Sequence, residues 1–306
     1  LNFVNRLARE LDKTWPEKNV VYTAYRNAIS APVMEKPEKN VVVYFAGFMY
    51  LSDHGRELSR KYFTDWRKLT DKMIVRPNFL HHGAAMPLNY SRKMVEDLKF
   101  CATSGIMGFC MDAVQGHWGS TGLHYYLAAR LLDNPALAYD SLMEEYYAEF
   151  YGPAAAQMRN YFEELEQFTN RIAESGNSNG IQSGWGAHAP DYYTNSEIER
   201  FSGLLKIAMD ATEDPIIRRR IALNMEAWEY TRLLCAVLQK VRSEGYLDGA
   251  RAELDQLNQW RNQHADSLSI DTQRDIWRWS CCRTAAAKPA AYWDEWEKHA
   301  VLPQEY

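Results

Sequence analysis

The chain of 306 residues is 46% hydrophobic, which is enough to build one large domain or two of ordinary size. It carries 35 Lys and Arg against 40 Asp and Glu, and the resulting net charge of −5 gives no electrostatic case for a nucleic acid or an anionic membrane surface as a partner. No apolar run approaches the roughly 18 residues that a membrane span requires.

The first third of the chain alternates helical patterns with short apolar runs that are typical of buried parallel strands. A helix is predicted at 2–14, with Phe3, Leu7 and Leu11 on one face. Four strands are predicted at 19–25, 40–47, 72–78 and 105–112. Further helices are predicted at 55–69, 89–103 and 122–132. The proline-containing segment 28–39 does not suit a crossover helix and is predicted to be a long loop over the site.

Polar and aromatic side chains follow each predicted strand. The candidates for ligand contact are Tyr25, Asn27, Arg76, Asn78, His82, Asp112, His117 and Trp118. Parallel sheets and barrels hold their ligands at the carboxyl ends of the strands, so these residues are expected to gather around one site. Their mixture of aromatic rings and hydrogen-bonding groups favours a sugar as the ligand.

From about residue 134 the pattern becomes entirely helical. Helices are predicted at 137–150, 153–174, 196–212, 214–244 and 247–267. The fold class is therefore predicted to be α/β then all-α, with four parallel strands in 1–133 and a helical domain in 134–306. The aromatic-rich segment 175–195 interrupts the helices and is expected to fold back towards the strand ends.

Four parallel strands by themselves make a small sheet with unpaired edges. Parallel sheets are normally covered on both faces, so the four strands are interpreted as the second half of a (β/α)8 barrel. The chain starts at Leu1 and enters a helical pattern at once. It is therefore expected to be the downstream portion of a longer protein.

Several motifs resemble those of one bacterial family. They are Val-Arg-Pro-Asn-Phe-Leu at 75–80, Met-Pro-Leu-Asn-Tyr at 86–90, Gly-His-Trp at 116–118 and Tyr-Tyr-Leu-Ala-Ala-Arg at 125–130, with Gly83, Asp112, Asn134-Pro135, Glu145-Tyr146 and Tyr151-Gly152. Over about residues 1–170 the chain resembles the glycoside-hydrolase-like proteins first catalogued as a domain of unknown function, which include the endo-β-N-acetylglucosaminidases of glycoside hydrolase family 163. The resemblance implies a (β/α)8 barrel followed by helices, in secreted or periplasmic proteins that degrade glycans. It also implies that the acid residues of the family lie upstream of this chain.

Glycoside hydrolysis generally needs two carboxylates roughly 5–10 Å apart. Asp112, at the end of the fourth predicted strand, is the catalytic candidate, and its alternative role is that of a structural cap on the following loop. Glu35 and Glu38 fall in the predicted loop and are expected to be solvated. The second carboxylate is therefore expected in the missing half of the barrel, and residues 1–306 alone are expected to be inactive.

The remaining candidates are interpreted as sugar-binding residues. Trp118 is expected to stack on a sugar ring, the alternative being a core position under the helices. His117 is expected to hydrogen-bond a hydroxyl group. Arg76 and Asn78 suit hydroxyls or an acetamide, although Arg76 could instead form a salt bridge between strands. Tyr44 is expected to serve packing.

The sequence predicts neither a metal site nor a cofactor. The adjacent His81 and His82 have no further ligands at metal-binding spacing, and there is no Cys-x-x-Cys motif. The five cysteines lack the spacing of a disulfide framework. They are interpreted as isolated buried thiols, of which Cys110 is the plainest case.

Three function classes can be weighed at this stage. The favoured one is a retaining or substrate-assisted glycoside hydrolase that acts on an oligo- or polysaccharide, with N-acetylglucosamine as the sugar that the resemblance suggests. A non-catalytic carbohydrate-binding protein would keep Arg76, Asn78 and Trp118 without an acid pair. An enzyme using a nucleotide would need a glycine-rich phosphate loop after a strand, which the sequence lacks. The sequence does not indicate an oligomeric state.

Overall fold

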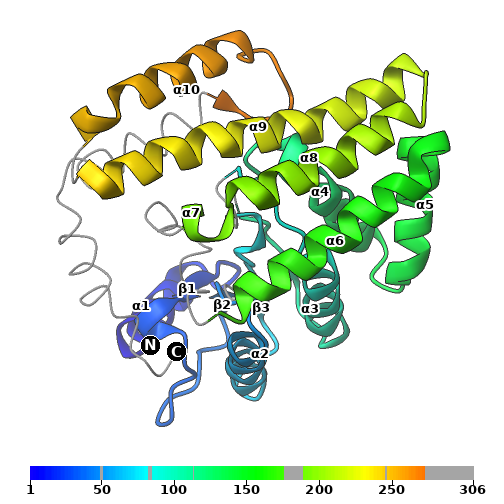
Figure 1. The fold of residues 1–306 in the computed structure, drawn as a ribbon. Helices are drawn as coiled ribbons and strands as arrows, with labels where there is room; N and C mark the ends of the chain where they lie inside the picture. The colour runs from blue at the N-terminus through cyan, green and yellow to red at the C-terminus, as the bar shows by residue number, and fades with distance from the viewer. Residues whose placement is uncertain (49–50, 82–84, 113, 176–188, 245–246, 273–306) are drawn as a thin grey trace.

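The computed structural model describes residues 1–48, 51–81, 85–112, 114–175, 189–244 and 247–272. A parallel sheet of four strands lies in chain order, formed by β1 (Val20–Ala24), β2 (Val41–Phe45), β3 (Met73–Val75) and β4 (Gly108–Phe109) (Figure 1). The pairing continues one residue further, because Arg76 N donates to the Phe45 carbonyl at 2.8 Å and Cys110 N to the Val75 carbonyl at 2.9 Å. The four predicted strands are confirmed, although they are shorter than the apolar runs, and their carboxyl ends are held side by side.

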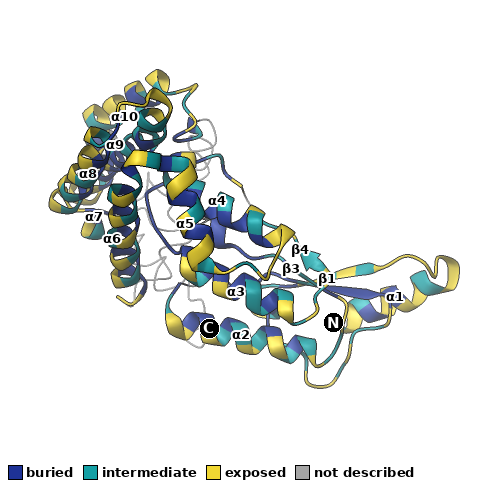
Figure 2. Cartoon of the chain, turned by 90° about the vertical axis from the view of Figure 1, so that its right-hand side faces the viewer, coloured by how far each residue is buried: buried dark blue, intermediate teal, exposed yellow. Residues whose placement is uncertain are grey.

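Helices α2 (Asp53–Arg67) and α3 (Ser91–Thr103) run along one side of the sheet (Figure 2). The Ser52 hydroxyl caps α2 by accepting a hydrogen bond from the backbone N–H of Gly55 at 3.2 Å. Phe45 is fully buried on this side and meets Phe63 of α2 edge-on, with ring centroids 5.7 Å apart. This packing forms the core beneath the sheet.

The opposite face of the sheet is partly open. Because successive side chains of a strand point to opposite faces, Thr23, Tyr44 and Ile74 share the face that turns away from Phe45. Val21 on the same face is 55% exposed, and Tyr44 and Ile74 are half-buried. The outer strands β1 and β4 each pair with a single described strand. The described part of the chain thus contains a small parallel sheet and no closed barrel.

The segment 29–40 lies beside α1 (Asn2–Thr14). Asn5 of α1 donates through Nδ2 to the Lys36 carbonyl at 2.9 Å, and its Oδ1 accepts from the backbone N–H of Glu38 at 3.1 Å. These contacts hold the segment against the helix that precedes the sheet. The structure therefore places the second half of this predicted loop along α1.

Beyond α4 (Trp118–Asp133) the described chain is helical. The helices are α5 (Tyr139–Tyr151), α6 (Ala155–Ala173), α7 (Ala189–Tyr192), α8 (Asn195–Asp210), α9 (Pro215–Glu244) and α10 (Arg251–Gln263), with 3-10 turns at Arg26–Ala28, Phe79–His81, Gly152–Ala154 and Leu247–Ala250. Trp228 of α9 stacks on Phe201 of α8 at 4.5 Å and donates through Nε1 to the Tyr161 hydroxyl at 3.0 Å. The long helices form a layer at one end of the molecule, and α1 lies at the other (Figure 2). The predicted order of an α/β part followed by helices is confirmed.

None of the described helices is long and apolar enough to cross a membrane.

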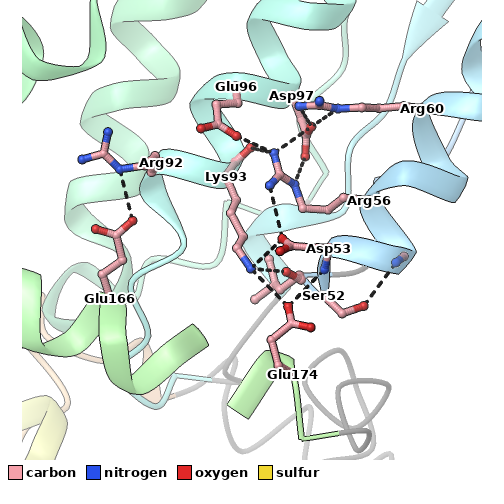
Figure 3. A network of polar contacts seen from close by, with 12 residues as sticks. Ser52, Asp53, Arg56, Arg60, Arg92, Lys93, Glu96, Asp97, Glu166 and Glu174 are labelled. Atoms are coloured by element: carbon pink, nitrogen blue, oxygen red, sulfur yellow. Dashed lines mark hydrogen bonds and ion pairs between the residues drawn. The ribbon is translucent and has the colours of Figure 1, made fainter. Parts of the chain in front are cut away.

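A network of charged side chains joins α2 and α3 to the end of α6 (Figure 3). Arg56 of α2 donates through Nε to Asp97 of α3 at 2.8 Å, and Arg60 contacts the same carboxylate at 2.6 Å. Glu174, which follows α6, accepts from the backbone N–H of Asp53 at the start of α2 at 3.1 Å. Because α2 begins shortly after β2 ends, this contact lies at the end of the sheet where the carboxyl ends of the strands lie.

Replacing Asp97 with Ala is expected to lower the free energy of unfolding by about 3–5 kcal/mol, because two arginines would lose their buried partner. The Asp97 side chain is only 1% exposed and the Arg56 side chain 10%. Urea unfolding of the purified variant measures the change. The matched control is Asp65→Ala on α2, whose carboxylate pairs with two exposed lysines and should cost no more than about 1 kcal/mol. Equal losses in the two variants would contradict the assigned role of Asp97.

Candidate functional site

The carboxyl ends of β3 and β4 are joined by an ion pair between two predicted site residues. Nη2 of Arg76 lies 2.5 Å from Oδ1 of Asp112. The Arg76 side chain is 30% exposed and the Asp112 side chain 18%, so that the pair can be reached from solvent. The structure thus brings Arg76 and Asp112 together at the sheet edge where the sequence placed a ligand.

The chemistry of this pair suits a hydroxyl-rich ligand. A guanidinium group has five N–H donors and no acceptor, whereas an ionised carboxylate only accepts. A sugar hydroxyl both donates and accepts, so it can satisfy both groups at once. An ion-paired carboxylate is better suited to orienting a ligand or stabilising positive charge than to donating a proton. The same contact also joins β3 to β4, which was the alternative role of Arg76.

Asn78 lies two residues beyond Arg76 and is 93% buried. Its Oδ1 atom has no hydrogen-bond partner among the described residues. Buried side-chain acceptors normally have a partner in the protein or in bound solvent. A buried acceptor of this kind, two residues after Arg76 in the chain, is consistent with the predicted ligand-binding role of Asn78.

The segment that follows Asn78 is fixed by the helices around it. Asn89 donates through its backbone N–H to Thr169 of α6 at 2.8 Å. Tyr90 donates through its backbone N–H to Nε2 of His124 on α4 at 3.2 Å. Burial lowers the pKa of His124 to about 3, so that the imidazole stays neutral and can accept this bond. The end of the loop after β3, at Asn89 and Tyr90, is therefore held between α4 and α6.

The turn before α4 is held by contacts from distant parts of the chain. Gly116 has a φ of +78°, a conformation that favours glycine. The Tyr125 hydroxyl accepts from the backbone N–H of Gln115 at 3.1 Å. His117 is 3% exposed, and its Nδ1 atom accepts from the backbone N–H of Asp271 at 3.1 Å. His117 thus helps to hold the turn together through Nδ1, and its predicted contact with a sugar hydroxyl stays a prediction.

Trp118 opens α4 and is 46% exposed. Its ring meets Tyr125 edge-on, with centroids 5.1 Å apart, and it does not occupy the core position that was the alternative. Its Cα lies at most about 20 Å from that of Asp112, since Trp118 is only six positions further along the chain. The neighbouring Gly119 fixes the start of α4 closely, because an added Cβ atom there would lie 2.2 Å from the Leu223 carbonyl oxygen. A partly exposed indole on a rigid helix terminus suits stacking on a sugar ring.

The remaining predicted residues lie further along the sheet or outside the described residues. Tyr25 is half-buried after β1, where the Arg26 guanidinium lies 5.2 Å from the centre of its ring. Asn27 is exposed on the following 3-10 turn. Both follow β1, which β2 separates from β3 in the sheet. His82 falls outside the described residues, as does most of the segment 175–195.

Backbone strain follows three of the four strands. The described non-glycine residues with positive φ are Arg26, Phe48 and Ala85, at +48°, +56° and +78°. Each lies in the segment that follows β1, β2 or β3, respectively. Such conformations cost of order 1 kcal/mol or more and often occur near functional sites. Their position is consistent with a site at the carboxyl ends of the strands.

The sequence interpretation missed Tyr44 and Cys110. Cys110 was predicted to be a buried thiol, but this was wrong, because β4 ends at Phe109 and Cys110 lies exposed just beyond it. Tyr44 was assigned to packing, yet its side chain lies close enough to Cys110, Arg76 and Asp112 for these groups to affect its pKa. The alternation of side chains along the strands could have predicted the exposure of Cys110, because this residue lies beside Arg76 on the open face of the sheet. Cys101 and Cys235 are buried as predicted.

Residues 1–164, more than half of the chain, match the family described as Domain of unknown function (DUF4838). The chain therefore belongs to this family. The matched part contains the whole sheet, the Arg76–Asp112 pair and Trp118. No curated protein and no solved structure matches the chain.

Proposed function

We propose that the complete protein hydrolyses glycosidic bonds and binds its sugar at the carboxyl ends of β3 and β4. The observation that carries the proposal is the solvent-accessible Arg76–Asp112 ion pair, which is followed six residues later by the exposed Trp118. A sugar ring has polar hydroxyl edges and apolar faces. The ion pair offers hydrogen bonds to the edges, and the indole offers an apolar surface to a face.

The four strands are, in this proposal, the second half of a (β/α)8 barrel. The partly open face that carries Thr23, Tyr44 and Ile74 supports it, since the inner face of a barrel strand requires further strands opposite. The single described neighbour of β1 and of β4 supports it as well, because a closed barrel has no edge strands. The other strands would come from chain outside residues 1–306. The helices from residue 134 onwards would form a separate domain.

The catalytic assignment follows from the chemistry of Asp112. As the partner of Arg76, it would orient the sugar or stabilise charge in the transition state, and a second carboxylate on the other half of the barrel would donate the proton. This division of roles fits a retaining or substrate-assisted mechanism. The resemblance to the glycoside hydrolase family 163 enzymes favours glycans with N-acetylglucosamine as substrates and a secreted or periplasmic location.

A non-catalytic carbohydrate-binding protein is the second candidate. It is favoured by one observation: among the described residues, Asp112 is the carboxylate found in the polar cluster at the strand ends. Such a protein would bind sugar through the same residues without cleaving it.

The test compares the complete gene product with the chain of residues 1–306. Both are incubated with released N-glycans and with plant and algal polysaccharides, and the products are identified by mass. We expect cleavage by the complete protein and none by residues 1–306 alone. Turnover by residues 1–306 would contradict the half-barrel, and binding without products by the complete protein would favour the second candidate. If the complete protein neither bound nor cleaved any of these glycans, the proposed sugar site would be contradicted.

A further inference from the structure

The open face of the sheet carries a polar cluster built from three neighbouring strands. Tyr44 of β2 pairs with Ile74 of β3, which pairs with Gly108 of β4. Because every second residue of a strand shares a face, Arg76 and Cys110 continue the row that begins with Ile74 and Gly108. Three polar or reactive side chains thus rise on one face at the carboxyl ends of adjacent strands.

The members of this cluster interact with one another. Tyr44 lies close enough to Cys110, Arg76 and Asp112 for all three side chains to affect its pKa, and Arg76 forms an ion pair with Asp112. Burial raises the pKa of Tyr44, and so do the Cys110 side chain and the charge of Asp112, whereas the charge of Arg76 lowers it. The phenol therefore stays protonated at neutral pH and can donate a hydrogen bond. The Cys110 thiol is exposed, so the cluster opens to solvent.

We infer that Tyr44 and Cys110 belong to the sugar-contacting surface, with Tyr44 as a hydrogen-bonding residue that helps to select the sugar held against the Arg76–Asp112 pair. The inference rests on the proposed function and extends it by two residues. A hydroxyl that served packing alone would lie among apolar groups. Tyr44 instead shares its face of the sheet with the exposed Cys110 and with Arg76 of the solvent-accessible ion pair, and both charges of that pair affect its pKa. In this inference a sugar bound to the ion pair also contacts the phenol and covers the thiol.

The exposed thiol provides a direct readout of occupancy. The complete protein is treated with N-ethylmaleimide, with and without a saturating concentration of released N-glycans, and labelling is followed by peptide mass. We expect the glycans to slow the labelling of Cys110 at least about threefold. Cys101 and Cys235 are buried and are expected to react only when the protein unfolds, which makes them internal controls.

The second readout is the affinity of Tyr44→Phe for the same glycans, measured by calorimetry. Loss of one hydrogen bond to the ligand should weaken binding about fivefold to tenfold. The matched control is Tyr22→Phe, because Tyr22 lies on the opposite face of the sheet with its ring 5.4 Å from that of Trp66. The control should bind as tightly as the unmodified protein.

The outcomes separate this inference from the proposed function. If the glycans bind but neither protect Cys110 nor bind more weakly to Tyr44→Phe, the inference is overturned while the sugar site stands. If the unmodified protein binds no glycan, both fail. If Tyr44→Phe does not fold, protection of Cys110 in the unmodified protein decides alone. Protection without any cleavage would support the inference and the binding-protein alternative together.

Discussion

Asp112→Asn in the complete protein is expected to lower kcat for glycan cleavage by about 10²–10⁴, with a smaller change in KM. Asn has nearly the same shape as Asp and can still accept a hydrogen bond from Arg76, but it removes the negative charge. A carboxylate that stabilises the transition state or takes part in proton transfer is expected to contribute a factor of this size. Initial rates, obtained from product masses at several glycan concentrations, give kcat and KM separately.

The matched control for this substitution is Asp71→Asn. Asp71 lies before the start of β3, at the opposite end of the sheet from Asp112, and its side chain is 96% exposed. Its replacement should leave both kinetic constants unchanged. A change of less than about threefold in kcat for Asp112→Asn would show that the ion pair only joins β3 to β4.

Trp118→Ala is expected to weaken glycan binding at least about tenfold while leaving the fold intact. The substitution removes the apolar indole surface on which the sugar ring would pack. The sugar would then bury less of its apolar face on binding, and its affinity would fall. Because Trp118 is 46% exposed, its loss leaves little cavity and should change Tm by only a few degrees. Calorimetry measures the affinity, and thermal unfolding followed by circular dichroism checks the fold.

Trp15→Ala is the control for a general effect of removing an exposed indole. Trp15 is 53% exposed and lies after α1, ahead of the start of β1. Its loss should leave glycan affinity unchanged. Equal affinities of Trp118→Ala and the unmodified protein would remove Trp118 from the site.

The strands and most helices could be predicted because their signal is local. The apolar runs matched the four strands, and the spacing of apolar residues matched the long helices. Local patterns do not show what covers a face, and α1 illustrates this. Its Phe3 is 77% exposed and its Leu7 47%, while the buried positions are Asn5 and Ala8.

The site could be predicted only in part, because several of its contacts join distant segments. Arg76 and Asp112 were placed correctly at adjacent strand ends, since the order of parallel strands brings such ends together. His117 was harder to interpret, because its partner Asp271 lies 154 residues further along the chain. Cys110 was misassigned because it continues β4 on the partly open face of the sheet, where its side chain is exposed.

A crystal structure of the complete protein with a bound oligosaccharide tests the location of the site most directly. The account predicts a sugar within hydrogen-bonding distance of Arg76 and Asp112, with the ring of one sugar unit against the indole of Trp118. An oligosaccharide bound elsewhere, with all three side chains in contact with solvent alone, would contradict it.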